Sequence, residues 1–158
     1  EFNDSIFRLN FDFDFMMVDG KLFVKDLKKL ESKFGFVEVV KKKAKESIQE
    51  IGKLDLVQDI TKLEQGINDV SFARKVVKVA SKSVVLRKCD KKDIINFIDT
   101  YDDTLKKKFK FDDSRQYINL DTKVSRTVFL QLLDDSFLYS QLTTNKYVSG
   151  SKDDINKI

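Results

Sequence analysis

The sequence predicts an α+β fold, in which two β-hairpins flank a mainly helical middle and a buried helix lies toward the C-terminus. Three observations predict it. Apolar and polar residues alternate near the start of the chain and again after residue 107, each time around a short polar turn. Between these segments, apolar residues recur at helical spacing. Because strands and helices are grouped rather than alternating, the order favours α+β over a parallel α/β sheet.

The first hairpin is predicted from the run Phe11–Met17. Its aromatic and apolar residues alternate with Asp12, Asp14 and Met16, which is typical of a half-buried strand. Asp19-Gly20 follows, and this dipeptide is a strong signal for a tight hairpin turn. We therefore expect residues 22–24 to begin the return strand.

Three helices are predicted next, each ending at a glycine. A short helix begins at Asp26 as N-cap, a longer one carries an apolar stripe from Val37 to Ile51, and a third covers Asp55–Gln65. Each is followed by a glycine that we expect in the left-handed conformation of a helix C-terminus, namely Gly35, Gly52 and Gly66.

The second half continues with two capped helices, a hairpin and a final helix. Asn68 or Asp69 caps a helix that runs to about Ser81, and Asp90 caps one that runs to Tyr101. Residues 108–112 and 116–120 form the second hairpin around Asp113-Ser114, and Thr122–Leu133 is a buried helix. No repeat or linker is visible, so we expect one domain over residues 3–148 and a polar tail over 149–158. The first two residues are interpreted as a cloning scar.

Composition excludes several classes of enzyme. The chain has no histidine and one cysteine, Cys89, so catalytic triads with histidine and tetrahedral zinc sites are excluded within it. The five glycines do not form a phosphate-binding loop. We therefore expect a protein that is not an enzyme and that needs no cofactor. A single cysteine and no apolar run of membrane-spanning length fit a cytoplasmic location.

Positive charge is concentrated on one predicted helix. The net charge is +4, but residues 36–92 hold fourteen Lys and Arg against eight Asp and Glu. In the helix that Asp69 caps, the basic residues face away from Val70, Ala73, Val76, Val77 and Ala80. A one-sided cationic surface binds phosphate backbones by counterion release, without reading sequence. The predicted DNA-binding residues are Arg74, Lys75, Lys78, Lys82, Arg87, Lys88, Lys91 and Lys92. A solvated helix face without a ligand is the alternative.

A Mg²⁺-dependent nuclease is a second alternative. Asp112 or Asp113, followed by a strand and then Asp121-Thr-Lys123, resembles an arrangement in which two carboxylates hold the metal and a lysine lies beside the attacking water. The same residues also have an ordinary explanation, since aspartates favour turns and Asp121 or Thr122 can cap the next helix.

The last stretch resembles a known family. Residues 124–147 read VSRTVFLQLLDDSFLYSQLTTNKY, and this pattern is similar to the C-terminal signature of the KwaB family, a component of the bacterial Kiwa antiphage system. The positions that carry it are Leu132, Leu133, Asp134, Asp135, Phe137, Leu138, Ser140, Leu142, Thr143 and Tyr147. The opening FDFDFMMVDGKLFV and the Phe34-Gly35 helix break are also similar.

The resemblance implies the C-terminal part of a longer protein that takes part in phage resistance. It further implies DNA binding and association with a membrane partner, KwaA, so that the protein is cytoplasmic or held at the inner membrane through that partner. It supplies no catalytic residues. From the residues themselves, we expect the signature's leucines and Phe137 to lie in the core and Asp134-Asp135 to end the helix.

An interaction scaffold is the remaining hypothesis. Several apolar residues have no place in the predicted amphipathic stripes, namely Phe7, Leu9, Phe36, Tyr139 and Tyr147. Because aromatic residues are favoured at interface cores, we expect a homodimer that buries some of them.

Overall fold

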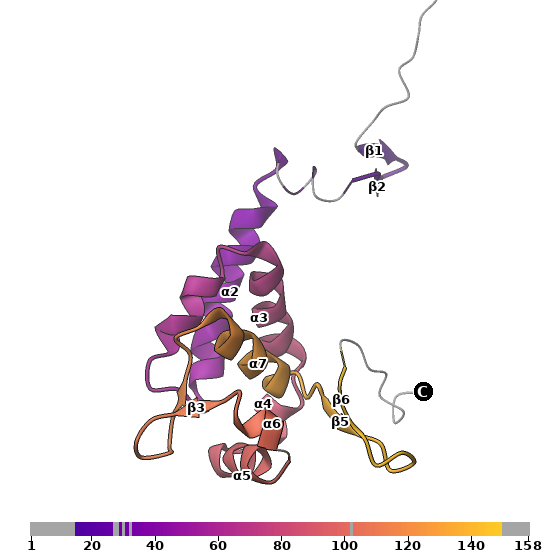
Figure 1. Cartoon of the computed structure of the whole chain (residues 1–158). Coiled ribbons are helices and arrows are strands. Elements are labelled where there is room, and N and C mark those ends of the chain that lie inside the picture. Colours follow the sequence, from indigo (N-terminus) through magenta and orange to yellow (C-terminus); the bar gives the residue numbers. More distant parts are fainter. Residues whose placement is uncertain (1–14, 27–28, 30, 32, 102, 150–158) are drawn as a thin grey trace, which may run out of the picture. The chain divides into compact units, whose positions relative to one another are not determined.

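The computed structural model describes residues 15–26, 29, 31, 33–101 and 103–149. The chain divides into two compact units, Glu1–Val39 and Val40–Ile158, and each is described by itself. The helices and strands are three small antiparallel pairs and a set of helices (Figure 1), so the predicted α+β class is confirmed. The predicted single domain over residues 3–148 stays a prediction. Phe7, Leu9, Phe11, Phe13 and the tail beyond Ser149 lie outside the described residues.

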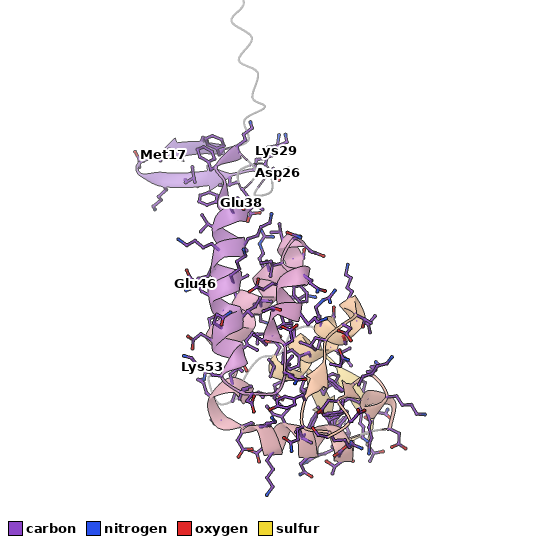
Figure 2. The ribbon with its side chains drawn as sticks, turned by 90° about the vertical axis from the view of Figure 1, so that its left-hand side faces the viewer. Met17, Asp26, Lys29, Glu38, Glu46 and Lys53 are labelled. Atoms are coloured by element: carbon purple, nitrogen blue, oxygen red, sulfur yellow. The ribbon has the colours of Figure 1, made fainter. Side chains whose placement is uncertain are left out.

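The first unit contains the first predicted hairpin. β1 (Phe15–Val18) pairs antiparallel with β2 (Lys21–Val24). Asp19 and Gly20 both have positive φ, 48° and 73°, as the tight turn requires. Burial differs from the expectation of a half-buried strand, because most side chains of the hairpin are exposed. Met17, labelled in Figure 2, is 72% exposed.

The second unit holds the whole buried core of the described residues, which runs from Ala44 to Phe137. Its elements are α2 (Phe36–Gly52, which begins in the first unit), the 3₁₀ helix η1 (Ile60–Gly66), α3 (Val70–Lys82), α4 (Val85–Lys88), α5 (Lys91–Tyr101), α6 (Asp103–Lys106), β3 (Lys110–Phe111), β4 (Ile118–Asn119), α7 (Lys123–Leu133), β5 (Phe137–Tyr139) and β6 (Lys146–Val148). The predicted α3, α5 and α7, the second hairpin and the long α2 are all present.

The segment after α2 departs from the prediction. Residues 53–59 are not helical, and only Ile60–Gly66 form a short 3₁₀ helix. The physical reason is a competing hydrogen bond. The backbone carbonyl of Leu56 accepts from the backbone N–H of Ile118 at 2.8 Å, which ties this stretch alongside β4.

The three glycines do not share one role. Gly35 has φ +68° and ends its helix as expected. Gly52 and Gly66 are not among the described residues with positive φ, so the prediction of left-handed caps was wrong for both. The left-handed residue after α2 is Asp55, with φ 52°. Gly66 is instead needed for space, because a Cβ there would lie 2.5 Å from the ring of Phe72.

The chain after α7 forms a third hairpin that the sequence pattern did not predict. α7 ends at Leu133 with Asp134 as its C-cap, and Asp135 takes φ 53°, so these two aspartates end the helix as expected. β5 then pairs antiparallel with β6. Leu132, Leu133 and Phe137 are buried, and Leu138 is half-buried. Leu142 was expected in the core but is 94% exposed, because it lies in the loop of this hairpin.

Candidate nucleic-acid interface

The orientation of α3 is fixed by its cap and its apolar face. The Asp69 carboxylate accepts hydrogen bonds from the backbone N–H groups of Ser71 at 2.9 Å and Phe72 at 3.3 Å. The face that lies in the core consists of Phe72, Ala73, Val76 and Val79, all at most 7% exposed. The four predicted basic residues are consequently turned outward, and all are exposed: Arg74, Lys75, Lys78 and Lys82.

The basic surface continues from α3 into α4 across a buried serine. Ser83 donates from Oγ to the carbonyl of Leu133 at 2.6 Å and accepts from the backbone N–H of Leu86 at 2.9 Å. The Nη2 of Arg87 donates to the carbonyl of Lys82 at 3.2 Å, so the two α4 cations follow directly on the end of α3. We call the six exposed side chains the α3–α4 basic surface: Arg74, Lys75, Lys78, Lys82, Arg87 and Lys88.

Two of the predicted cations make strong internal contacts. The Nζ of Lys78 lies 2.7 Å from Oδ2 of Asp134 at the end of α7, which ties α3 to α7. The Nζ of Lys91 lies 2.9 Å from Oδ2 of Asp55 and 3.8 Å from the ring centroid of Tyr117. The ammonium group of Lys91 is therefore engaged in contacts within the fold, whereas Lys92 is exposed on α5.

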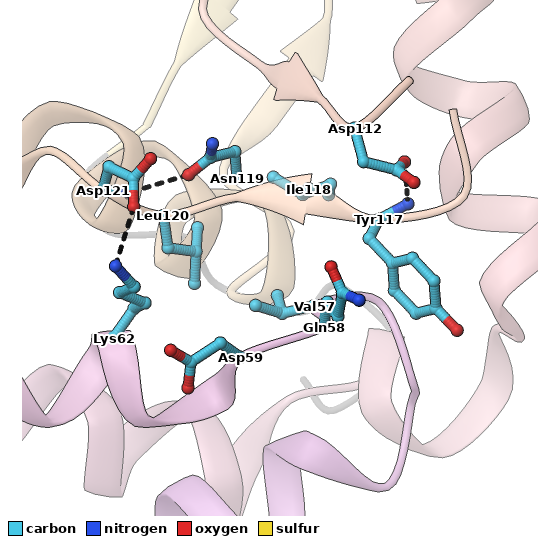
Figure 3. A pocket seen from close by; sticks show the side chains of 10 residues that line it. All are labelled: Val57, Gln58, Asp59, Lys62, Asp112, Tyr117, Ile118, Asn119, Leu120 and Asp121. Carbon is cyan, nitrogen blue, oxygen red and sulfur yellow. Dashed lines mark hydrogen bonds and ion pairs between the residues drawn. The ribbon is translucent and has the colours of Figure 1, made fainter. Parts of the chain in front are cut away.

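Two of the residues named in the nuclease hypothesis, Asp112 and Asp121, line one pocket of about 180 Å³. Figure 3 shows the two at opposite ends of β4. The hydroxyl of Ser114 and the backbone N–H groups of Tyr117 and Gln116 hold the pKa of Asp112 below its usual range. The pKa of Asp121 is also lowered, chiefly by Lys62, whose Nζ lies 3.0 Å from its Oδ1. Each carboxylate is thus already satisfied by protein donors.

The remaining residues of that hypothesis lie outside this pocket. Asp113 does not line it, and neither does Lys123, which contributes to a separate pocket with Gln65 and Arg126. The Nζ of Lys123 lies 3.8 Å from Oδ2 of Asp69, the cap of α3. Within the described part of the chain, no three His, Cys, Asp or Glu side chains are grouped so that they could hold a metal ion. The structure does not bring the four predicted nuclease residues together.

The single cysteine is a poor nucleophile in this setting. Cys89 is half-buried beside Val85, Ile94 and Phe97. Burial raises the pKa of its thiol, and the nearby carboxylate of Asp93 raises it further. Since the thiolate is the reactive form, this environment keeps Cys89 protonated.

The sequence did not predict a second candidate site, a pocket lined by aromatic rings and lysines. A pocket of about 280 Å³ lies between α5, α6 and the third hairpin, and it is lined by Tyr101, Leu105, Lys108, Phe137, Lys146, Tyr147 and Val148. The available signal was a pair of short apolar and aromatic triplets, Phe137–Tyr139 and Lys146–Val148. Neither triplet was predicted to be a strand.

Fold and site together define a small basic α+β protein that presents a one-sided cationic helix surface. Comparison with known proteins gives its family. The chain belongs to the family described as Kiwa protein KwaB-like, whose profile matches residues 1–143. It is similar to the Kiwa protein KwaB of Escherichia coli O55:H7, with 30% identity over 154 residues. That match covers 98% of this chain and the C-terminal part of the relative, 49% of its length.

No solved structure matches significantly. Among the described residues, no helix is long and apolar enough to cross a membrane.

Proposed function

We propose that the chain binds DNA without reading its sequence, through the α3–α4 basic surface, and that it does so in antiphage defence. The observation that carries the proposal is the one-sidedness of α3. Its apolar face is buried in the core, which turns Arg74, Lys75, Lys78 and Lys82 to solvent. No acidic residue occurs between Val70 and Lys82, so the helix itself does not neutralise this charge.

The chemistry of the surface favours backbone contact over base recognition. Lysine and arginine neutralise phosphates and release counterions, which gives affinity that depends strongly on salt. Lys75, Lys82 and Lys88 make no ion pair within the described residues, so their charge is available to a ligand. Lys78 shares its charge with Asp134 and contributes less.

The defence role and the partners are proposed from the family. Membership of the Kiwa protein KwaB-like family supports a role in antiphage defence. We propose that the chain acts there with a membrane partner of the KwaA type, as the family resemblance implies. The chain spans about half the length of the curated relative it matches, and these roles concern the whole protein. We propose that the chain acts by binding and not by catalysis, because the residues of the nuclease hypothesis are not gathered in one pocket.

The test compares two double charge reversals that change net charge equally. K75E/K82E alters the α3–α4 basic surface without breaking an ion pair of the described structure. K42E/K45E alters exposed lysines on α2. We expect K75E/K82E to weaken binding to a duplex about tenfold or more at low salt and to reduce the slope of log affinity against log salt by about 2. K42E/K45E should retain most of the affinity.

Fluorescence anisotropy with a labelled duplex, measured at several salt concentrations, reports both quantities. Circular dichroism checks that both variants are folded. If K75E/K82E binds as the unmodified chain does, or if both variants lose affinity equally, the assignment to this surface is wrong.

An interaction scaffold is the second candidate, favoured by exposed apolar side chains. Phe36, Tyr139 and Tyr147 are 44%, 52% and 49% exposed. None of the three has a place in the predicted amphipathic stripes, and a homodimer would bury them. Light scattering measures the mass directly, and a monomer at high concentration contradicts this candidate.

A further inference from the structure

The pocket between α5, α6 and the third hairpin combines aromatic rings with lysines. Its rings come from Tyr101, Phe137 and Tyr147, and its charges come from Lys108 and Lys146. None of the described residues that line it is acidic. By contrast, the exposed side chains of the α3–α4 basic surface include no aromatic ring. The two sites therefore differ in the chemistry they offer to a nucleic acid.

The floor of the pocket is apolar and held in place. Leu105 and Phe137 are buried, at 4% and 7% exposure. The hydroxyl of Tyr101 donates to the carbonyl of Leu138 at 2.9 Å, which fastens α5 to β5. The Tyr101 ring also packs against Phe97, with centroids 4.8 Å apart, and against Phe137 at 6.1 Å. A ligand would therefore meet preformed rings and need not order them.

The rim of the pocket is cationic and carries one accessible ring. The Nζ of Lys146 hydrogen-bonds to the carbonyl of Tyr101 and lies 5.0 Å from the centroid of its ring. Lys108 is exposed and makes no ion pair within the described residues. Tyr147 is 49% exposed, so part of its ring faces solvent at the mouth of the pocket. A ligand that suits this lining is flat, aromatic and attached to an anion.

We infer that this pocket takes an unpaired nucleobase of single-stranded DNA. Tyr147 provides the accessible stacking surface above the apolar floor. Lys108 and Lys146 contact the flanking phosphates. Proteins that bind single strands combine a cationic groove with aromatic side chains in this way, and stacking tolerates any base. A paired base inside a duplex cannot enter, because its faces are covered by its neighbours. The inference rests on the proposed DNA-binding function and adds a preference for strand ends or unpaired segments.

The test uses three labelled probes of equal length: a single strand, an abasic single strand with the same phosphates, and a blunt duplex. We expect Y147A to weaken binding to the single strand by about 5- to 150-fold. Binding to the abasic strand and to the duplex should stay within about twofold of the unmodified chain, since both rely on phosphate contacts. Y147F should restore single-strand affinity, because it keeps the ring.

The matched control is Y139A, which removes an exposed tyrosine of the same hairpin that does not line the pocket. It should bind all three probes normally. K108E changes an exposed side chain outside the hairpin, and it should weaken both single-stranded probes. Unchanged single-strand binding in Y147A, or an equal loss on the abasic strand, overturns the inference. So does an equal loss in Y139A, or tighter binding of an acidic peptide than of the single strand. The duplex affinity of the unmodified chain tests the proposed function separately.

Discussion

At the scale of single residues, Gly66 is required by a neighbouring ring. A Cβ at this position would meet Cε1 of Phe72 at 2.5 Å, and Phe72 belongs to the buried face that orients α3. Phe72 is only 7% exposed. The position of Gly66 therefore bears on the candidate DNA surface, although Gly66 contributes no side chain to it.

The variant G66A should lower the free energy of unfolding by about 1–3 kcal/mol, the range for forcing extra volume into a packed core. G52A is the matched control. Its Cβ would lie 3.5 Å from Ile60, an ordinary contact, at the end of a helix where alanine is favoured over glycine. It should be neutral or stabilising by about 0.4–1 kcal/mol. Urea denaturation followed by circular dichroism measures both. Equal stability of the two variants would refute this account of Gly66.

At the scale of elements, the helices predicted best are those in which an N-cap residue and an apolar face both appear in the sequence. Asp69 caps α3, and Thr122 caps α7, in each case with a side-chain oxygen that accepts from the following turn. Both helices also carry apolar residues on the side that lies in the core. Cap and stripe are local properties, so the beginning and the orientation of α3 could be predicted, and with them the exposure of its basic residues.

Prediction failed where the deciding contact is distant in sequence. Residues 55–59 were expected to be helical, but Leu56 hydrogen-bonds to Ile118, sixty-two residues later. The third hairpin was missed because its three-residue strands are joined by the loop 140–145, which contains no Asp-Gly or Asp-Ser dipeptide like those that marked the two predicted hairpins. Thr144 takes the left-handed conformation there, with φ 55°, which is unusual for a β-branched residue. The aromatic pocket was missed with it, since its lining comes from α5, α6 and that hairpin together.

Ser83 joins three elements and gives a test at this scale. Its side chain is 5% exposed and bonds both the end of α7 and the start of α4. S83A leaves the carbonyl of Leu133 and the N–H of Leu86 without these partners, so it should lower the free energy of unfolding by about 1–3 kcal/mol. S81A removes an exposed hydroxyl that bonds only within α3, and its effect should stay within about 0.5 kcal/mol. Chemical denaturation compares them, and an equally small effect in both would contradict the linking role of Ser83.

At the scale of the whole molecule, the two candidate sites differ in the chemistry that they would offer to a nucleic acid. The α3–α4 basic surface offers cations without rings, which suits a backbone of any sequence. The aromatic pocket offers rings with two lysines, which suits an exposed base. Both lie in the unit Val40–Ile158. Neither proposal depends on the residues before α2.

A fragment that begins at Phe36 tests this independence. Every buried core residue of the described chain lies between Ala44 and Phe137, and the hairpin of the first unit contributes none. Starting at Phe36 keeps α2 whole. We expect the fragment 36–158 to unfold cooperatively, with a Tm within a few degrees of the full chain, and to bind duplex DNA with the same salt dependence. Circular dichroism and anisotropy measure these properties. A fragment without a cooperative transition would show instead that residues 3–148 fold as one domain, as the sequence predicts. A folded fragment that no longer binds DNA would locate the interface before α2, away from α3.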